Sequence, residues 1–242
     1  MTVTWEELGW ERLAAGVGRC RLPGWDCTVG LVVGEGTALL IDAGSSLAEG
    51  ARLRAQVQEL AGHRVTHLAL THPHFDHVFG AAAFAGAEVY GAVGMDTVFD
   101  ARHAREELRT DAVGNGLDAR VAEEAVDALV APRHHVSGEW TLDLGGGRQV
   151  LLANVGPGHT AHDLVVLVPG APEVVFCGDL VEESGEPQAG PDAVPSHWPA
   201  ALDRLLDLGG EDALYVPGHG AVVDAEFVRA QREELAARFG VS

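Results

Sequence analysis

The sequence contains no lysine. All 16 of its basic residues are arginine, against 36 acidic residues, which gives a formal net charge of −20. Schiff-base chemistry is therefore excluded, as is a lysine that would bind a substrate carboxylate. A surface of this charge repels phosphate backbones, so nucleic acid is not expected as a partner. We expect a small-molecule substrate, and the composition is compatible with a homo-oligomer.

Cysteines and long apolar runs are also scarce. The three cysteines, Cys20, Cys27 and Cys177, are an odd number without zinc-finger spacing, which fits a reducing compartment better than a disulfide scaffold. Although 47% of the residues are apolar, no window approaches an uninterrupted apolar membrane span, so no membrane association is expected. The N-terminus lacks the basic and apolar segments of a secretory signal, and we expect a cytoplasmic protein.

The chain length allows one large domain with a full core, so residues 1–242 are expected to form a single domain. The predicted strands fall into two blocks, separated by a charged, alanine-rich helical insert at about 95–130. This insert predicts two helices joined at Gly114-Asn115-Gly116, which form either a solvated surface or a lid or subunit contact. Strands are predicted at 27–34, 37–41, 66–70, 88–90, 141–144, 149–155, 164–168, 174–176 and 213–216, and helices at 47–61, 78–84, 199–208 and 225–239.

The most informative stretch is 71–77, THPHFDH, which follows an apolar run and is typical of a loop after a buried strand. Neutral imidazoles and a carboxylate are preferred ligands of zinc and similar divalent ions. His72 and His74 alternate and can point at one ion. Asp76 and His77 follow too closely to join that ion easily, so they suit a second ion nearby. A loop that is merely histidine-rich, or a lone structural zinc site, is the weaker interpretation.

Three further residues, His159, Asp179 and His219, each come just after a predicted apolar strand and beside a glycine. Glycine lets the backbone turn sharply and brings the neighbouring side chain to the rim of a sheet. Any one of these residues alone would be explained as a polar turn residue. Three of them, together with the stretch 71–77, indicate a shared metal site.

On these residues the chain resembles the metallo-β-lactamase fold hydrolases, from Ile41-Asp42-Ala43-Gly44 to Gly218-His219-Gly220. The resemblance implies an α/β fold, a four-layer αβ/βα sandwich of two mixed β-sheets with helices on both outer faces. It also implies a dinuclear metal centre. In that centre one ion is held by His72, His74 and His159, the other by Asp76, His77 and His219, and Asp179 bridges both.

The activity that this resemblance implies is hydrolysis with two zinc ions per chain as cofactors, although a His/Asp set also accepts manganese, iron or cobalt. Two dications that share one water lower its pKa toward roughly 7, which gives a metal-bridging hydroxide at neutral pH. The expected substrate is a small ester, lactone, thioester or amide. Asp76 is the expected catalytic carboxylate, which orients the hydroxide or moves its proton while it remains a ligand.

Four residues are further candidates around this site. Asp42, at a strand end, would orient a metal-bound histidine. His162 would contact substrate or support a ligand, and His197 and Trp198 would border the pocket. Two other functions stay open at this point: an oxidoreductase with a single iron, as in the persulfide dioxygenases, and a metal-binding module without catalytic activity.

Overall fold

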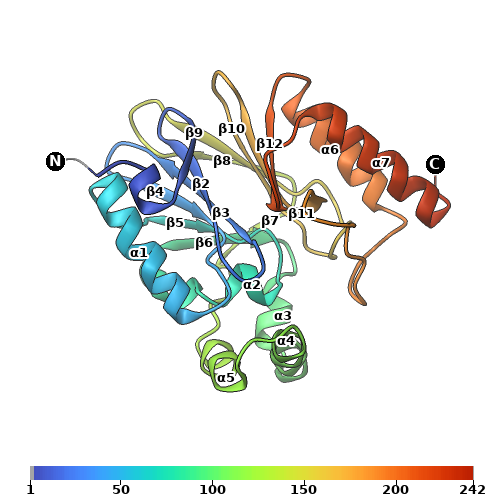
Figure 1. The fold of residues 1–242 in the computed structure, drawn as a ribbon, viewed down its shortest axis with the longest axis horizontal. Helices are drawn as coiled ribbons and strands as arrows, with labels where there is room; N and C mark the ends of the chain where they lie inside the picture. Colours follow the sequence, from blue (N-terminus) through green and yellow to red (C-terminus); the bar gives the residue numbers. More distant parts are fainter. Residues whose placement is uncertain (1–2, 242) are drawn as a thin grey trace.

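The computed structural model describes residues 3–241, and its framework is a pair of β-sheets (Figure 1). One sheet consists, in spatial order, of β1 (Glu11–Ala14), β2 (Val17–Arg21), β3 (Thr28–Val33), β4 (Ala38–Ile41), β5 (His67–Ala69), β6 (Glu88–Ala92) and β7 (His134–Val136). The other consists of β12 (Leu214–His219), β11 (Val174–Glu182), β10 (Val165–Val168), β9 (Gln149–Ala153) and β8 (Glu139–Asp143). The first sheet is antiparallel up to β4 and parallel from there to β7. The second is antiparallel except for the parallel pair β11–β12, so both sheets are mixed.

Alternating side chains of the central strands fill three apolar layers. In β3, Val32 lies in the core between the sheets, whereas Leu31 lies in the core outside the first sheet. In β11, Phe176 faces the central core and Val175 faces the core outside the second sheet. Because both faces of each sheet are apolar, both sheets need helices on their outer sides.

The helices supply those outer layers (Figure 1). They are α1 (Leu47–Ala61), α2 (Phe75–Val78), α3 (Asp96–Asp100), α4 (Arg102–Gly114), α5 (Ala119–Asp127), α6 (Trp198–Gly209) and α7 (Ala225–Phe239), with 3₁₀ helices η1 (Glu6–Leu8) and η2 (Ala81–Phe84). Helix α1 covers the first sheet through Leu53 and Val57, and α6 and α7 cover the second sheet. The four-layer sandwich expected from the sequence is thereby confirmed.

Helices α3 to α5 occupy the segment between β6 and β7 where the sequence predicts a helical insert. Their apolar faces, including Leu108 and Ala112 of α4 and Ala125 of α5, complete the core beneath the first sheet. Helix α4 also packs against α2, which carries part of the stretch 71–77. In Figure 1 these helices form the lower end of the molecule.

Several predicted boundaries were wrong. The helix predicted at 78–84 is interrupted because the backbone at Gly80 packs on Ala43, and the Gly80 N–H donates to the Gly44 carbonyl at 3.0 Å. Strands β11 and β12 run past the predicted ends at 176 and 216, so Asp179 and His219 lie within strands.

The strands β1, β2 and β7 were not predicted. In β2 a polar residue occupies a buried position, since Arg19 is 4% exposed and pairs with Glu11 on β1 at 2.7 Å. A buried, paired arginine interrupts the pattern of apolar residues from which a buried strand is predicted.

Position 50 of α1 has room only for glycine, because the backbone of Gly80 packs directly against it. A Cβ at Gly50 would lie 2.2 Å from the Gly80 carbonyl oxygen, whereas a Cβ at Gly114, the last residue of α4, would meet nothing within 4 Å. Alanine normally stabilises a helix relative to glycine by up to about 1 kcal/mol. We expect Gly114→Ala to follow that rule and Gly50→Ala to lower the free energy of unfolding by about 1–3 kcal/mol through overpacking. Urea unfolding of both variants with metal content held constant measures the difference, and equal stabilisation by both would contradict the predicted clash.

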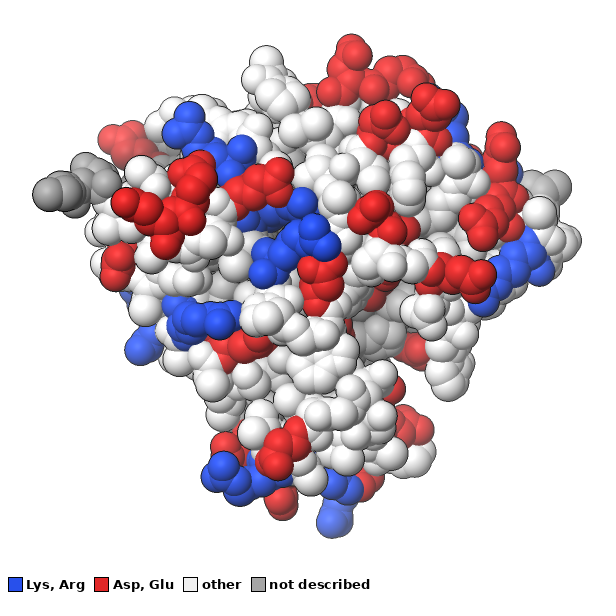
Figure 2. Space-filling view, in the orientation of Figure 1, with Lys and Arg blue, Asp and Glu red and all other residues white. Residues whose placement is uncertain are grey.

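Among the charged side chains on the face shown in Figure 2, the acidic ones are the more widespread, and the basic ones gather in a few places. This distribution agrees with the formal net charge of −20. Among residues 3–241, every helix is too short or too polar to cross a membrane.

Candidate metal centre

Five histidines and two aspartates from both sheets meet at one end of the sandwich. His72 follows β5, His74 precedes α2, and Asp76 and His77 lie within α2. The remaining members come from the second half of the chain: His159 from the loop after β9, Asp179 from β11 and His219 from the end of β12. The structure therefore brings together all seven residues that are predicted from the sequence as metal ligands.

One group of donor atoms consists of His72, His74, His159 and Asp179. The His159 Nε2 atom lies 3.0 Å from His74 Nδ1. The Asp179 Oδ2 atom lies 3.4 Å from His159 Nε2 and 3.5 Å from His72 Nε2. All four side chains therefore direct one atom at a common point.

A second group lies on the other side of Asp179. The Asp179 Oδ1 atom is 3.2 Å from His77 Nε2, and Oδ2 is 3.3 Å from His219 Nε2. Asp76 Oδ2 completes the group, at 3.4 Å from His219 Nε2 and 3.7 Å from His77 Nε2. Gly218 makes this approach possible, because a Cβ there would lie 1.8 Å from Asp179 Oδ1. The carboxylate of Asp179 is thus shared by both groups.

The outer hydrogen bonds of His72 and His77 fix which nitrogen faces inward. Asp42 Oδ2 accepts the N–H of His77 Nδ1 at 2.8 Å and also the hydroxyl of Thr71 at 2.8 Å. Since that hydroxyl donates to Asp42, its oxygen accepts from His72 Nδ1 at 3.0 Å. Both rings therefore direct Nε2 into the cluster. Asp42 itself has a φ of 62°, a conformation that is uncommon for aspartate.

Each of the other three rings also makes one outward hydrogen bond, which fixes the nitrogen that faces inward. His219 Nδ1 donates to the Trp25 carbonyl at 2.7 Å, and His159 Nδ1 donates to the Gln188 carbonyl at 3.0 Å. His74 is reversed: its Nε2 donates outward to Asp192 Oδ2 at 3.0 Å, so its Nδ1 faces inward. All five imidazoles thus direct their other ring nitrogen into the same small volume.

This arrangement fits a pair of metal ions. Two ligand atoms that each lie about 2.0–2.1 Å from a tetrahedral zinc ion are about 3.3 Å apart. The separations given above run from 3.0 to 3.7 Å, and the donor atoms of the first group all lie within 4.8 Å of one another. His72 Nε2 and Asp179 Oδ1 are buried without any hydrogen-bond partner, and unpaired buried polar atoms are costly unless a ligand satisfies them.

Burial and the two carboxylates set the protonation of the cluster without metal. Burial lowers the pKa of His72, and it lowers the pKa of His159 to about 4. Burial also acts to lower the pKa of His219, but the charge of Asp179 and its hydrogen bond raise it to about 9. His72 and His159 are therefore neutral imidazoles at pH 7, the form that binds metal. Burial also acts to lower the pKa of His74, but its hydrogen bond with Asp192 and the charge of that carboxylate raise it.

The four additional candidates have different positions. Asp42 bonds His77, as described above. Trp198 is fully buried behind His159, with ring centroids 5.5 Å apart, and its indole N–H donates to the Leu180 carbonyl. His162 bonds the Val93 carbonyl at 3.1 Å and lies outside the two ligand groups. His197 is exposed at the start of α6, where its ring contacts Ser196.

Sequence reasoning missed the outer partners of the rings and one thiol. No pattern marks Trp25 or Gln188, because their backbone carbonyls are the acceptors, and Asp192 lies far from His74 in the chain. The Cys27 thiol lies beside His77, at 3.7 and 3.8 Å from the two ring nitrogens, and donates to the Asp76 carbonyl. Its sulfur lies within 4.8 Å of donor atoms of Asp76 and His77, so the thiol is a further candidate ligand beside the second group.

Asp163 holds the loop that carries His159. Its buried carboxylate accepts from the Gly158 N–H at 2.9 Å and from the Thr160 hydroxyl at 2.7 Å. We expect Asp163→Ala to lower the free energy of unfolding by about 1–3 kcal/mol, because these buried donors lose their acceptor. It should also weaken metal binding by His159.

The stability effect of Asp163 depends on pH. Burial raises the pKa of Asp163 from 3.8 to about 7, despite hydrogen bonds that lower it. The folded state therefore binds more protons than the unfolded state between about pH 4 and 7, and this contribution to stability is lost as the pH rises through that window. Urea unfolding from pH 4 to 7 should show a smaller loss with rising pH in Asp163→Ala than in the wild type and in the exposed control Asp212→Ala. Parallel pH curves for all three proteins would count against this assignment.

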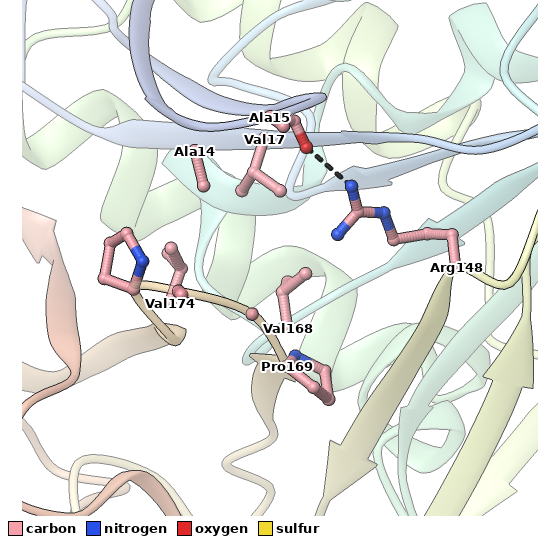
Figure 3. Close-up of a pocket in the computed structure, with 10 residues that line it drawn as sticks. Ala14, Ala15, Val17, Arg148, Val168, Pro169 and Val174 are labelled. Carbon is pink, nitrogen blue, oxygen red and sulfur yellow. Dashed lines mark hydrogen bonds between the residues drawn. The ribbon is translucent and has the colours of Figure 1, made fainter.

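A separate hollow of about 130 Å³ lies at the opposite end of β11, where Val174 begins the strand (Figure 3). Its walls are mainly aliphatic, including Val17 and Val168, and Arg148 at its edge donates to the Ala15 carbonyl at 2.6 Å. It contains none of the candidate metal ligands.

The sandwich and its convergent His/Asp cluster define a class of metal-binding α/β proteins. Residues 22–219 match the family model of the Metallo-beta-lactamase superfamily, and the chain belongs to this superfamily. It is 28% identical over 197 residues to the Metallo-beta-lactamase domain-containing protein 1 of Xenopus laevis, covering 81% of this chain and 71% of that protein.

Solved structures show the same fold. The metallo-beta-lactamase FIM-1 from Pseudomonas aeruginosa, in a mono-zinc form, is 20% identical, with a TM-score of 0.69 over 95% of both chains. A metallo-beta-lactamase from Pontibacter korlensis is 22% identical, with a TM-score of 0.69 over 93% of this chain and 97% of that one. At these identities the similarity concerns the fold.

Proposed function

We propose that this protein is a dinuclear metal-dependent hydrolase that takes two zinc ions per chain and acts on a small ester, lactone, thioester or amide. The observation that carries the proposal is the orientation of the five histidines. Each donates one ring N–H to an outer acceptor and directs its other nitrogen inward. The inward nitrogens of His74 and His159 lie 3.0 Å apart, a distance that requires a shared proton or a metal ion between them.

The residues divide into two ligand sets with one shared member. His72, His74 and His159 would hold one ion; Asp76, His77 and His219 would hold the other; and Asp179 would contact both. When bound, such a pair of dications lowers the pKa of a shared water toward about 7 and supplies hydroxide at neutral pH.

Asp76 is the proposed catalytic carboxylate. It is 7% exposed, its Oδ2 atom is 3.4 Å from His219 Nε2, and it lies at the start of α2, where α4 covers that helix. We propose that it orients the attacking water and holds its proton at a carboxylate oxygen. The ligand histidines would stay neutral in this step, since their inward nitrogens would be bound to the metal ions and their outward N–H groups are engaged.

Metal analysis and a substrate panel test the proposal. Protein purified without added metal is expected to contain two zinc ions per chain. It should hydrolyse members of a panel of esters, lactones, thioesters and amides, lose activity with a chelator and recover it with zinc. His103→Ala, whose side chain is 87% exposed, is the matched control that keeps both properties. One iron per chain would instead favour the dioxygenase alternative, and metal binding without turnover of any panel member would favour a non-catalytic module.

A further inference from the structure

One loop contacts two of the three histidines in the first ligand group. This loop, residues 183–197, connects β11 with α6. Its Gln188 carbonyl accepts from His159 Nδ1, and its Asp192 carboxylate accepts from His74 Nε2, both at 3.0 Å. The two histidines lie in segments that follow strands of different sheets, β5 and β9, so the loop spans the first ligand group from outside.

Other contacts fix the flanks of the same loop. Near its start the Glu183 N–H donates to the His219 carbonyl at 3.1 Å, and near its end the Val194 N–H donates to the Gly158 carbonyl at 2.9 Å. Arg238 of α7 donates to the Pro187 carbonyl at 2.9 Å. Between positions 187 and 194, the two bonds to the ligand histidines connect the loop to the metal centre.

We infer that the 183–197 loop and the first metal ion stabilise one another, with Asp192 as the positioning residue for His74. This inference rests on the proposed function in assuming that the cluster binds metal. The Asp192 carboxylate holds the proton of His74 on Nε2 and restrains the ring, so that Nδ1 stays aimed at the ion. If the ordered loop raises the affinity for the ion, the bound ion stabilises the ordered loop by the same free energy, because linkage is reciprocal.

The Asp192–His74 pair has a limited but measurable role. The side chains of His74 and Asp192 are 25% and 47% exposed, so solvent weakens the charge interaction between them. Losing such an outer carboxylate partner typically lowers metal affinity about 10–100-fold.

Zinc affinity measured by chelator competition is the first test, on the full chain. Asp192→Ala is expected to weaken one of the two zinc-binding steps by about 10–100-fold. Asp192→Asn should weaken it less, because the amide oxygen still accepts from His74. Glu186→Gln, which removes the same charge from the same loop without touching a ligand, should leave both steps unchanged. Equal affinity in wild type and Asp192→Ala overturns the inference.

Two further readouts separate positioning from a general structural effect. Long-range ¹H–¹⁵N spectra of the zinc-loaded protein should show His74 protonated on Nε2 in the wild type and a mixture or exchange broadening in Asp192→Ala. Zinc should slow cleavage within residues 184–193 by a protease of broad specificity, with the cut sites identified by mass spectrometry, in the wild type, and less so in Asp192→Ala. Zinc binding without any change in loop cleavage also overturns the inference, whereas a wild type that binds no zinc overturns the proposed function itself.

Discussion

Asp179→Ala is expected to reduce the metal content toward one ion per chain and to abolish most hydrolysis. One carboxylate serves both ligand groups, with Oδ1 3.2 Å from His77 and Oδ2 3.3 Å from His219. His77, His72 and His219 in turn lower the pKa of Asp179 well below its usual range, against burial, which raises it. Its removal leaves the two ions with less compensating charge and without a common ligand. We expect activity to fall more than about 100-fold, as when a single electrostatic group of an active site is removed.

Elemental analysis and steady-state kinetics measure this effect. Asp179→Asn keeps the shape of the side chain and removes its charge, so comparing it with the alanine variant separates charge from the cavity. Asp203→Ala is the control, because Asp203 is an exposed aspartate that pairs with Arg232 away from the cluster. Two ions per chain and full activity in Asp179→Ala would reject the bridging role.

Removing the metal is expected to destabilise the fold strongly. The cluster joins segments next to β5, β9, β11 and β12, so a bound ion would connect segments that are distant in the chain. A ligand that binds only the native state at 1,000 times its dissociation constant adds about 4 kcal/mol to the free energy of unfolding. For a chain of 242 residues, that corresponds to roughly 8–16 °C in the melting temperature. Calorimetry of chelator-treated and zinc-loaded protein measures the shift.

The size of this shift should depend on pH. In the metal-free protein, burial acts to lower the pKa of His219, but Asp179 raises it to about 9, above the ordinary value of 6.5. The folded state therefore binds the extra proton between about pH 6.5 and 9, and its contribution to stability is lost as the pH rises through that window. In loaded protein the metal replaces that proton. The difference in melting temperature should thus grow from pH 6.5 to 9, and a difference that shrinks over this range would contradict this origin.

The sequence was informative wherever local pattern decided the structure. Helix α1 begins and ends at the predicted residues, since Ser46 accepts from the Glu49 N–H and Gly62 adopts a φ of 74°. The predicted end of the strand at 176 was wrong, because the register of β11 against β12 shifts around Gly178 and the strand continues beyond it, through Asp179. Such an irregularity depends on the neighbouring strand, which a local pattern does not contain.

The sequence by itself determined the chemical identity of the donors and the layered fold that carries them. The spacing within 71–77 and the apolar strands before His159 and His219 are local properties that can be read directly from the sequence. Only the tertiary structure decided which nitrogen of each ring faces inward. The acceptors that fix those rings are the Trp25 and Gln188 carbonyls and the Asp192 carboxylate, which come from distant segments. A backbone carbonyl has no side-chain identity, so its role arises only when folding places it beside a histidine.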